Sequence, residues 1–159
     1  MKTEQLIVKM LLDRWNSLIK SCDTTLESIT DEQLQKEIGP GKNRGIYLLG
    51  HLIAVHDEMI QILGLGDKQY PELYEPFIKS PDRTVNDIPS SKELRTYWNK
   101  QNEVVTQKFN SLQPEEWFLK HNSVSAEDFI KEPHRNRLNV LLTRTTHLAY
   151  HAGQLILLK

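Results

Sequence analysis

Apolar residues recur at intervals of three or four over four long stretches of this 159-residue chain, and this spacing limits the fold more than any other feature. The stretches cover about Thr3–Ser28, Asn43 or Ile46 to Leu63, Ser90–Leu112, and about Asn136 to the terminus. No segment between them alternates with the period of two that a half-buried strand requires. The sequence therefore predicts an all-α fold.

Two capping boxes mark where helices begin. Thr30 with Gln33 predicts a short helix that continues through Ile38, and Ser90 with Glu93 opens the third long helix. Gly39-Pro40-Gly41 is expected to end the short helix, because glycine and proline do not continue it.

The connections are long enough to shape the fold. Asp67–Pro89 is rich in proline, charge and aromatic residues, which favours an ordered excursion over a regular helix and could wall a site. A polar connection follows the third long helix. It begins at Gln113-Pro114-Glu115-Glu116, where the chain restarts after the helix ends. Four helices of roughly 20–26 residues are about 30–39 Å long. We predict a four-helix bundle with long crossover connections, in one domain over residues 1–159.

Composition argues against several classes of protein. The 20 basic and 21 acidic residues give a net charge of −1, so neither a nucleic acid nor an anionic membrane is an expected partner. Cys22 is the only cysteine and is expected in the core of a protein from a reducing compartment. We find neither a signal peptide nor an apolar run long enough to cross a bilayer, which favours a cytoplasmic location.

His147 and His151 are the best candidates for chemistry. They lie four residues apart on the last helix, so both imidazoles project from one face and can share a metal ion. His51, among apolar neighbours on the second long helix, is the best third ligand. Chance spacing and a core histidine bonded to backbone remain open alternatives. Leu148 stands where a zinc protease needs glutamate, which argues against that class.

The other histidines fit a metal site less well. His56 lies about 140° around the helix from His51 and is expected at the surface or in contact with a ligand residue. His121 and His134 are expected in loops.

Four further residues near the histidines have two interpretations each. Glu58 lies two turns after His51, where it could face a substrate as a catalytic group or form a surface ion pair. Tyr150 and Gln154 could donate hydrogen bonds to a bound ligand, although tyrosine at such positions is often packing. Gly153 suggests close approach of another element, or is a tolerated glycine.

Leu-Leu-Gly precedes His51, and the last helix carries the motif His147-x-x-x-His151-x-Gly153-Gln154. Through these residues the chain resembles the DinB/YfiT-like superfamily, over essentially its whole length. The resemblance implies a four-helix bundle in which His51, His147 and His151 bind a divalent metal such as zinc or nickel. Many members carry arginine after the second motif histidine, whereas this chain has Ala152.

An open position on a three-histidine metal favours catalysis over a structural site. The resemblance implies an enzyme that activates a low-molecular-weight thiol co-substrate, of the S-transferase type, acting on a small-molecule substrate. The alternatives are a hydrolase that uses metal-bound hydroxide with Glu58 as base, and a non-catalytic, stress-associated metal-binding protein. A homodimer is expected, because helical bundles often pair.

Overall fold

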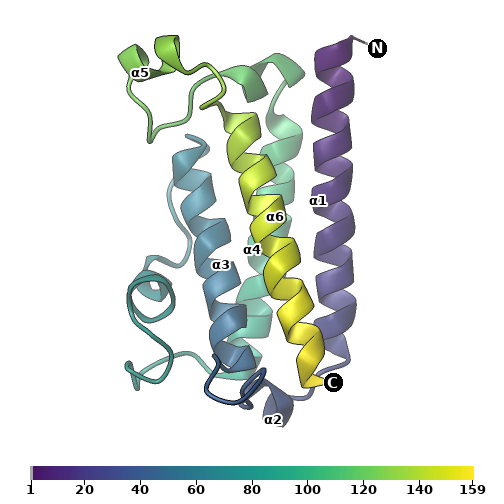
Figure 1. The fold of residues 1–159 in the computed structure, drawn as a ribbon, viewed down its shortest axis with the longest axis vertical. Coiled ribbons are helices and arrows are strands. Elements are labelled where there is room, and N and C mark those ends of the chain that lie inside the picture. Colours follow the sequence, from purple (N-terminus) through teal and green to yellow (C-terminus); the bar gives the residue numbers. More distant parts are fainter. Residues whose placement is uncertain (1) are drawn as a thin grey trace.

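The computed structural model describes residues 2–159 and confirms the all-α prediction (Figure 1). The long helices are α1 (Thr3–Glu27), α3 (Gly45–Ile62), α4 (Ser91–Ser111) and α6 (Arg137–Leu155). Short helical segments lie between and after them: α2 (Asp31–Leu34), η1 (Pro71–Leu73), η2 (Glu75–Lys79), η3 (Pro114–Phe118), α5 (Ala126–Lys131) and η4 (Ile156–Leu158). Extended pairing in residues 2–159 is limited to two isolated bridges.

The four long helices form a bundle in which α1 lies beside α6, α6 beside α3, and α3 beside α4 (Figure 1). Helices α1 and α6 run in one direction, and α3 and α4 run in the other. Because α3 and α4 are parallel, residues 63–90 must return along the length of the bundle before α4 begins. The predicted long crossover is therefore present.

Helix α3 is the most buried helix because it packs against both α4 and α6 and is covered by η1 and η2. Its sequence is apolar on nearly every side, as a central helix requires. On the other side of the core, the Phe109 ring packs edge-on against Trp15 and Trp117, both almost fully buried. Each such aromatic contributes about 2–3 kcal/mol by leaving water.

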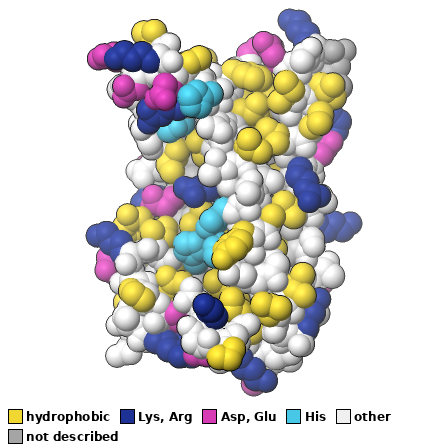
Figure 2. Space-filling model, in the orientation of Figure 1, with side chains coloured by type: hydrophobic (Ala, Val, Ile, Leu, Met, Phe, Trp, Pro, Cys, Tyr) yellow, Lys and Arg dark blue, Asp and Glu magenta, His cyan; other side chains and the backbone are white. Residues whose placement is uncertain are grey.

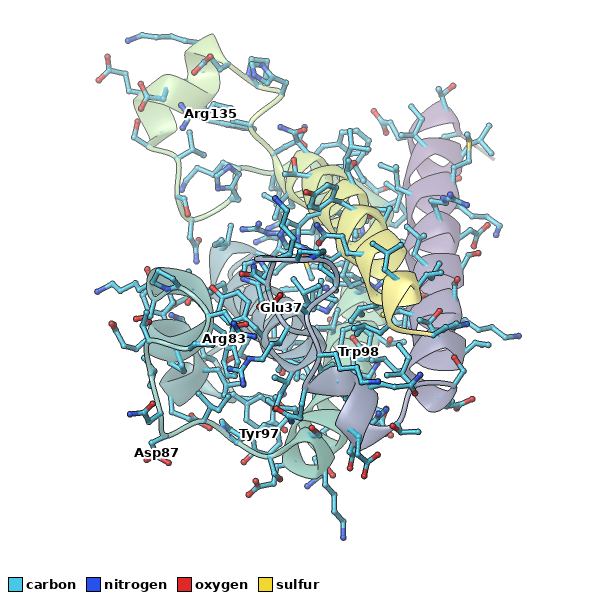
Figure 3. The ribbon with its side chains drawn as sticks, turned by 60° about the horizontal axis from the view of Figure 1, so that its bottom comes forward. Glu37, Arg83, Asp87, Tyr97, Trp98 and Arg135 are labelled. Atoms are coloured by element: carbon cyan, nitrogen blue, oxygen red, sulfur yellow. The ribbon has the colours of Figure 1, made fainter. Side chains whose placement is uncertain are left out.

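The predicted short helix is too long: α2 ends at Leu34 rather than at Ile38. Beyond it, the backbone N–H of Ile38 donates to the carbonyl of Asn43, and Gly45 donates to Lys36. This pairing of the two sides of a turn replaces the helical hydrogen bonds. At the same end of the bundle, Arg83 forms a 2.7 Å ion pair with Glu37 (Figure 3).

The connection before α6 contains one helix that the sequence analysis missed. The Ser125 hydroxyl accepts a hydrogen bond from the Asp128 backbone N–H and begins α5. A helix of six residues is too short to show a period, and none of its residues is buried.

Close helix approach occurs at two glycines, but not at Gly153. A Cβ atom at Gly50 would lie 2.4 Å from the Phe77 ring, and one at Gly45 would lie 2.3 Å from Leu158. The expectation for Gly153 is wrong, since a Cβ there would meet nothing within 4 Å. Gly153 is thus a tolerated glycine on an exposed part of α6.

Among the described residues, no helix has both the length and the apolar character that crossing a membrane requires.

Candidate metal centre

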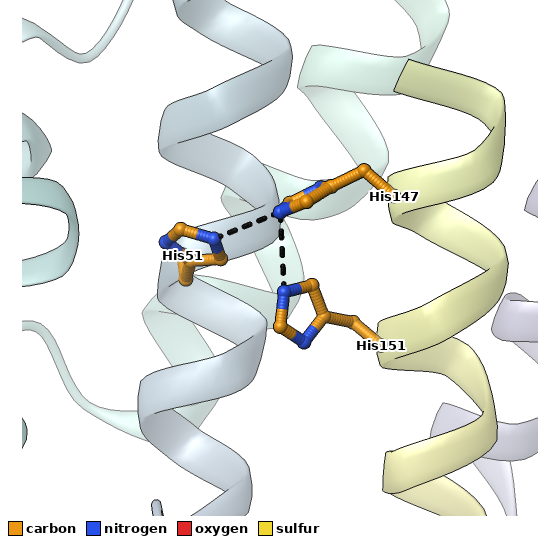
Figure 4. Close-up of side chains that lie close together, drawn as sticks. All are labelled: His51, His147 and His151. Carbon is orange, nitrogen blue, oxygen red and sulfur yellow. Dashed lines mark hydrogen bonds between the residues drawn. The ribbon is translucent and has the colours of Figure 1, made fainter. Parts of the chain in front are cut away.

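Three histidines from two helices converge between α3 and α6 (Figure 4). The Nε2 atom of His147 lies 3.1 Å from the Nε2 atoms of both His51 and His151. Each of the three residues offers one ring nitrogen, and these nitrogens all lie within 4.8 Å of one another. The pairing of α3 with α6 thus brings together residues that are 96 positions apart in the chain.

Hydrogen bonds at the opposite ring nitrogens orient two of the three imidazoles. His51 Nδ1 donates to the backbone carbonyl of Phe77 at 2.7 Å, and His151 Nδ1 donates to Gln154 Oε1 at 2.7 Å. Each bond places the proton on Nδ1 and leaves the Nε2 lone pair free. Metal-binding histidines are held in this way by a carbonyl or carboxamide behind them.

The hydrogen positions that these bonds impose leave the cluster one proton short. His51 Nε2 and His151 Nε2 are both acceptors, and His147 Nε2 can donate to only one of them. At least one of the two 3.1 Å contacts therefore lacks a hydrogen bond and leaves an acceptor lone pair unsatisfied. A cation between the three nitrogens accepts that lone pair.

The distances fit a first-row divalent cation. A tetrahedral zinc site with Zn–N bonds of about 2.0–2.1 Å separates its nitrogen ligands by about 3.3 Å. The observed 3.1 Å separations are close to that value. All three histidines are half-buried, and Figure 2 shows histidine side chains at the surface near the middle of this face. The protein thus offers three candidate ligands, and their half-burial leaves one side of the cluster accessible.

Gly50 allows the Phe77 carbonyl to reach His51. The Phe77 ring lies against the α3 backbone in the space that a side chain at position 50 would fill. Phe77 is fully buried in the π-helical turn η2, so its carbonyl position is fixed by the core. On the same side, the Tyr47 ring stacks parallel to the His51 ring at a centroid distance of 6.3 Å.

Burial keeps the three imidazoles neutral. It lowers the pKa of His147 to about 4, together with the smaller effects of His151 and His51. Burial also lowers the pKa of His51, against the opposing effect of the Phe77 carbonyl, and lowers that of His151. Neutral imidazole is the form that binds a metal, so the site needs no deprotonation at neutral pH.

His147 differs from the other two in its second nitrogen. Its Nδ1 is buried without a hydrogen-bond partner in the described chain. This ligand is therefore oriented only by its side-chain packing and by the other two histidines.

The remaining predicted site residues lie around the cluster rather than within it. Glu58 is partly buried and forms an ion pair with Lys68. Tyr150 is 64% exposed, with its ring edge-on to His151. Gln154 Oε1 already accepts a hydrogen bond from His151 Nδ1, so it positions a candidate ligand rather than facing a substrate.

The surface position expected for His56 is wrong. His56 is fully buried, and its ring packs 4.8 Å from Trp15 and 5.5 Å from Trp98. The 140° rotation from His51 points it into the core, because α3 is surrounded by other helices rather than exposed on that side. His121 and His134 lie in the α4–α6 connection, as expected.

Two contributors to the site were missed. The Phe77 carbonyl belongs to the backbone, so no side-chain pattern signals it. The one available signal, not used in the sequence analysis, was Gly50 beside His51, because a glycine allows another segment to approach the helix closely. Arg144 lies three residues before His147, a spacing that places it on the same helix face and was visible in the sequence.

Comparisons with known proteins identify the family and support the fold. A sequence profile of the DinB superfamily matches residues 14–155. The fold is similar to a crystal structure of a conserved protein from Enterococcus faecalis, with a TM-score of 0.65 and 16% identity. That match covers 98% of this chain and 94% of the other, and at this identity it supports the fold alone. No curated protein matches the chain.

Proposed function

Because the chain belongs to the DinB superfamily and brings three histidine nitrogens to one point, we propose that it is a divalent-metal-dependent S-transferase. It would activate a low-molecular-weight thiol supplied from outside and transfer it to an electrophilic small molecule. Zinc or nickel is the proposed metal, because imidazole nitrogen suits both.

The observation that carries this proposal is the convergence of three Nε2 atoms whose lone pairs cannot all be satisfied by one another. Three protein ligands with an open fourth position are typical of a catalytic site, whereas structural sites use four. A divalent cation held there supplies Lewis acidity, which lowers the pKa of a coordinated thiol or water molecule.

An external thiol is favoured because the protein cannot provide one itself. Cys22 is fully buried, and burial together with the nearby Asp23 raises its pKa to about 12. A thiol in that environment is neither ionised nor accessible at neutral pH. The reacting sulfur must therefore come from a co-substrate.

The residues of the chain prepare the site for that reaction. The Phe77 carbonyl and Gln154 hold His51 and His151 with their lone pairs pointing to one place. In the overall reaction, the thiol S–H bond breaks and its proton passes to water. A sulfur–carbon bond forms, and the leaving group of the electrophile departs with the bonding electron pair.

Hydrolysis at the same site has less support. It needs a general base, and Glu58 is the only candidate that the sequence suggests. The ion pair between Glu58 and Lys68 stabilises the carboxylate as a charge partner. The carboxylate that hydrolysis would need as its base is therefore already in contact with Lys68, and this favours thiol transfer.

The test begins with metal content, measured by elemental mass spectrometry on untagged wild-type protein and on His51→Ala and His147→Ala. We expect about one ion per wild-type chain and loss in both variants. The loaded protein is then screened for conjugation with a panel of thiols and electrophiles. Absence of metal after loading, or loaded protein that neither binds nor conjugates any thiol, would contradict the proposal.

A further inference from the structure

A small cavity lies nearer the start of α6 than the candidate metal centre, and none of the three histidines lines it. Its volume is about 230 Å³, and it lies between the end of α3 and the first half of α6. Ile62 and Val140 give it apolar walls, while Thr143 and Arg144 supply polar groups. Ligand pockets for drug-sized molecules are about 300–1,000 Å³. The cavity therefore suits a short-chain molecule or one end of a larger one.

Arg144 connects this cavity to the three histidines. It lines the cavity and lies one helical turn before His147 on α6. Residues three apart on a helix have Cβ atoms about 5–6 Å apart, so a ligand bound to Arg144 lies beside His147.

Arg144 has no partner of its own. It is half-buried, yet it forms neither a hydrogen bond nor an ion pair with any residue from 2 to 159. Glu58 is the acidic group whose charge reaches it, but Glu58 is in contact with Lys68 instead. An unpaired, partly desolvated cation has an energetic cost that an anionic ligand would remove.

Two other partly buried arginines, Arg44 and Arg95, have side-chain partners, whereas Arg137, like Arg144, has none among residues 2–159. Arg44 binds Asp82 through two nitrogens, and Arg95 binds Asp31 together with two backbone carbonyls. These arginines have structural roles at the end of the bundle where α4 begins. Of the two partly buried arginines without a partner in the described chain, Arg144 is the one that lies one helical turn from a candidate metal ligand, His147.

We propose that Arg144 binds the carboxylate of a small organic thiol whose sulfur end reaches His51, His147 and His151. This inference rests on the proposed function and specifies the chemistry of its co-substrate. The planar guanidinium fork matches a carboxylate with two parallel hydrogen bonds. A divalent cation among three neutral imidazoles adds a second positive charge nearby, so the combined site favours an anion over a neutral molecule.

The test compares two thiols of nearly equal size, 3-mercaptopropionate and 3-mercaptopropionamide. Binding of each to the cobalt(II)-loaded protein is followed by the sulfur-to-cobalt absorption band. We expect wild-type protein to bind the carboxylate about tenfold or more tightly than the amide, because hydrogen bonds to charged groups are the stronger ones. Arg144→Gln should remove this preference, and Arg144→Lys should retain part of it.

Arg14→Gln is the matched control. Arg14 is an exposed arginine on α1, and its replacement should leave the preference unchanged. Metal content and circular dichroism establish that each variant is folded and loaded. Equal preference in wild-type protein and Arg144→Gln, or no preference in wild-type protein, would overturn the inference while leaving thiol activation intact.

A second measurement applies if the protein binds no metal, in which case the proposed function fails on its own. The side-chain Nε–H signal of Arg144, assigned by comparison with Arg144→Lys, is then followed by NMR in the metal-free protein. Propionate should shift this signal and propionamide should not. A signal that responds to neither probe would overturn the anion site.

Discussion

His51 and His56 lie five residues apart on the same helix and have opposite surroundings. His51 is half-buried, with one nitrogen bonded to the Phe77 carbonyl and the other directed at two more histidines. His56 is fully buried between Trp15 and Trp98, and neither of its nitrogens has a hydrogen-bond partner in residues 2–159. Only the first arrangement prepares a lone pair for a ligand.

The comparison teaches that burial alone does not identify a functional histidine. Burial lowers the pKa of both residues, and for His56 it lowers the value to about 3. The distinguishing feature is the partner behind the ring, which determines the position of the proton and the direction of the free lone pair. Four changes test this distinction, in order of decreasing expected effect.

The largest difference should follow from removing each histidine in turn. His51→Ala should weaken metal binding by more than about a hundredfold, since four-ligand sites of about 10–16 kcal/mol correspond to about 3 kcal/mol per ligand. His56→Leu should leave metal binding unchanged. Competition with a chelator of known affinity measures both. Comparable losses of metal affinity in the two variants would show that His51 and His56 do not differ in their contribution to metal binding.

The second change acts on the partner rather than on the ligand. Gly50→Ala places a Cβ atom 2.4 Å from the Phe77 ring, so the ring and its carbonyl must move away from His51. We expect metal affinity to fall by about tenfold to a hundredfold, the usual effect of losing such a partner. Gly153→Ala is the control, because its Cβ meets nothing. Unchanged affinity in Gly50→Ala would show that the carbonyl is dispensable.

The third change concerns the pH dependence of stability in metal-free protein. His56 has a folded-state pKa of about 3, below the unfolded value of about 6.5. The unfolded chain therefore binds the proton first as the pH falls. Stability should decrease between pH 6.5 and pH 3 by about 1.4 kcal/mol per pH unit from this residue.

Urea unfolding at several pH values measures the contribution of His56 as the difference between wild-type protein and His56→Leu. The remaining histidines contribute equally to both proteins and cancel. His56→Leu should be the less pH-sensitive of the two. Identical slopes would mean that His56 is protonated in the folded protein.

The smallest effect is expected at Gln154. Its Oε1 accepts a hydrogen bond from His151 Nδ1. Because Gln154 is only half-buried, a water molecule can partly replace this hydrogen bond when the side chain is removed. Gln154→Leu should reduce metal affinity by about tenfold at most. Calorimetric titration with zinc would show the change. A loss as large as that of His51→Ala would make Gln154 equal in importance to a ligand.

The fold and the grouping of histidines were largely predictable from the sequence. Four periodic stretches predicted the long helices to within a few residues, because each helix buries an apolar stripe along its whole length. His147 and His151 share a helix face by spacing alone. His51 was selected as the best third ligand because it lies among apolar residues on the second long helix, and the resemblance to the DinB/YfiT-like superfamily supported that choice. Its distance in space depends on how α3 packs against α6, which the sequence does not contain.

The errors concern features that local patterns do not contain. The burial of His56 depends on α3 being enclosed by neighbouring helices, which a helix considered alone does not reveal. The partner of His51 is a backbone carbonyl, and any residue at position 77 would offer one. The guanidinium of Arg144 has no partner among the described side chains because Glu58, the nearby acidic group, forms an ion pair with Lys68. Each is a property of tertiary packing.

The parallel arrangement of α3 and α4 has a consequence for redesign of this chain. An 18-residue helix is about 27 Å long, a distance that about eight extended residues can cover. Residues 63–90 are far more than that minimum, and a protein engineer could regard the surplus as removable. The surplus includes Phe77, however. A shortened version could keep the topology and all three histidines, yet lose the group that determines which tautomer His51 adopts.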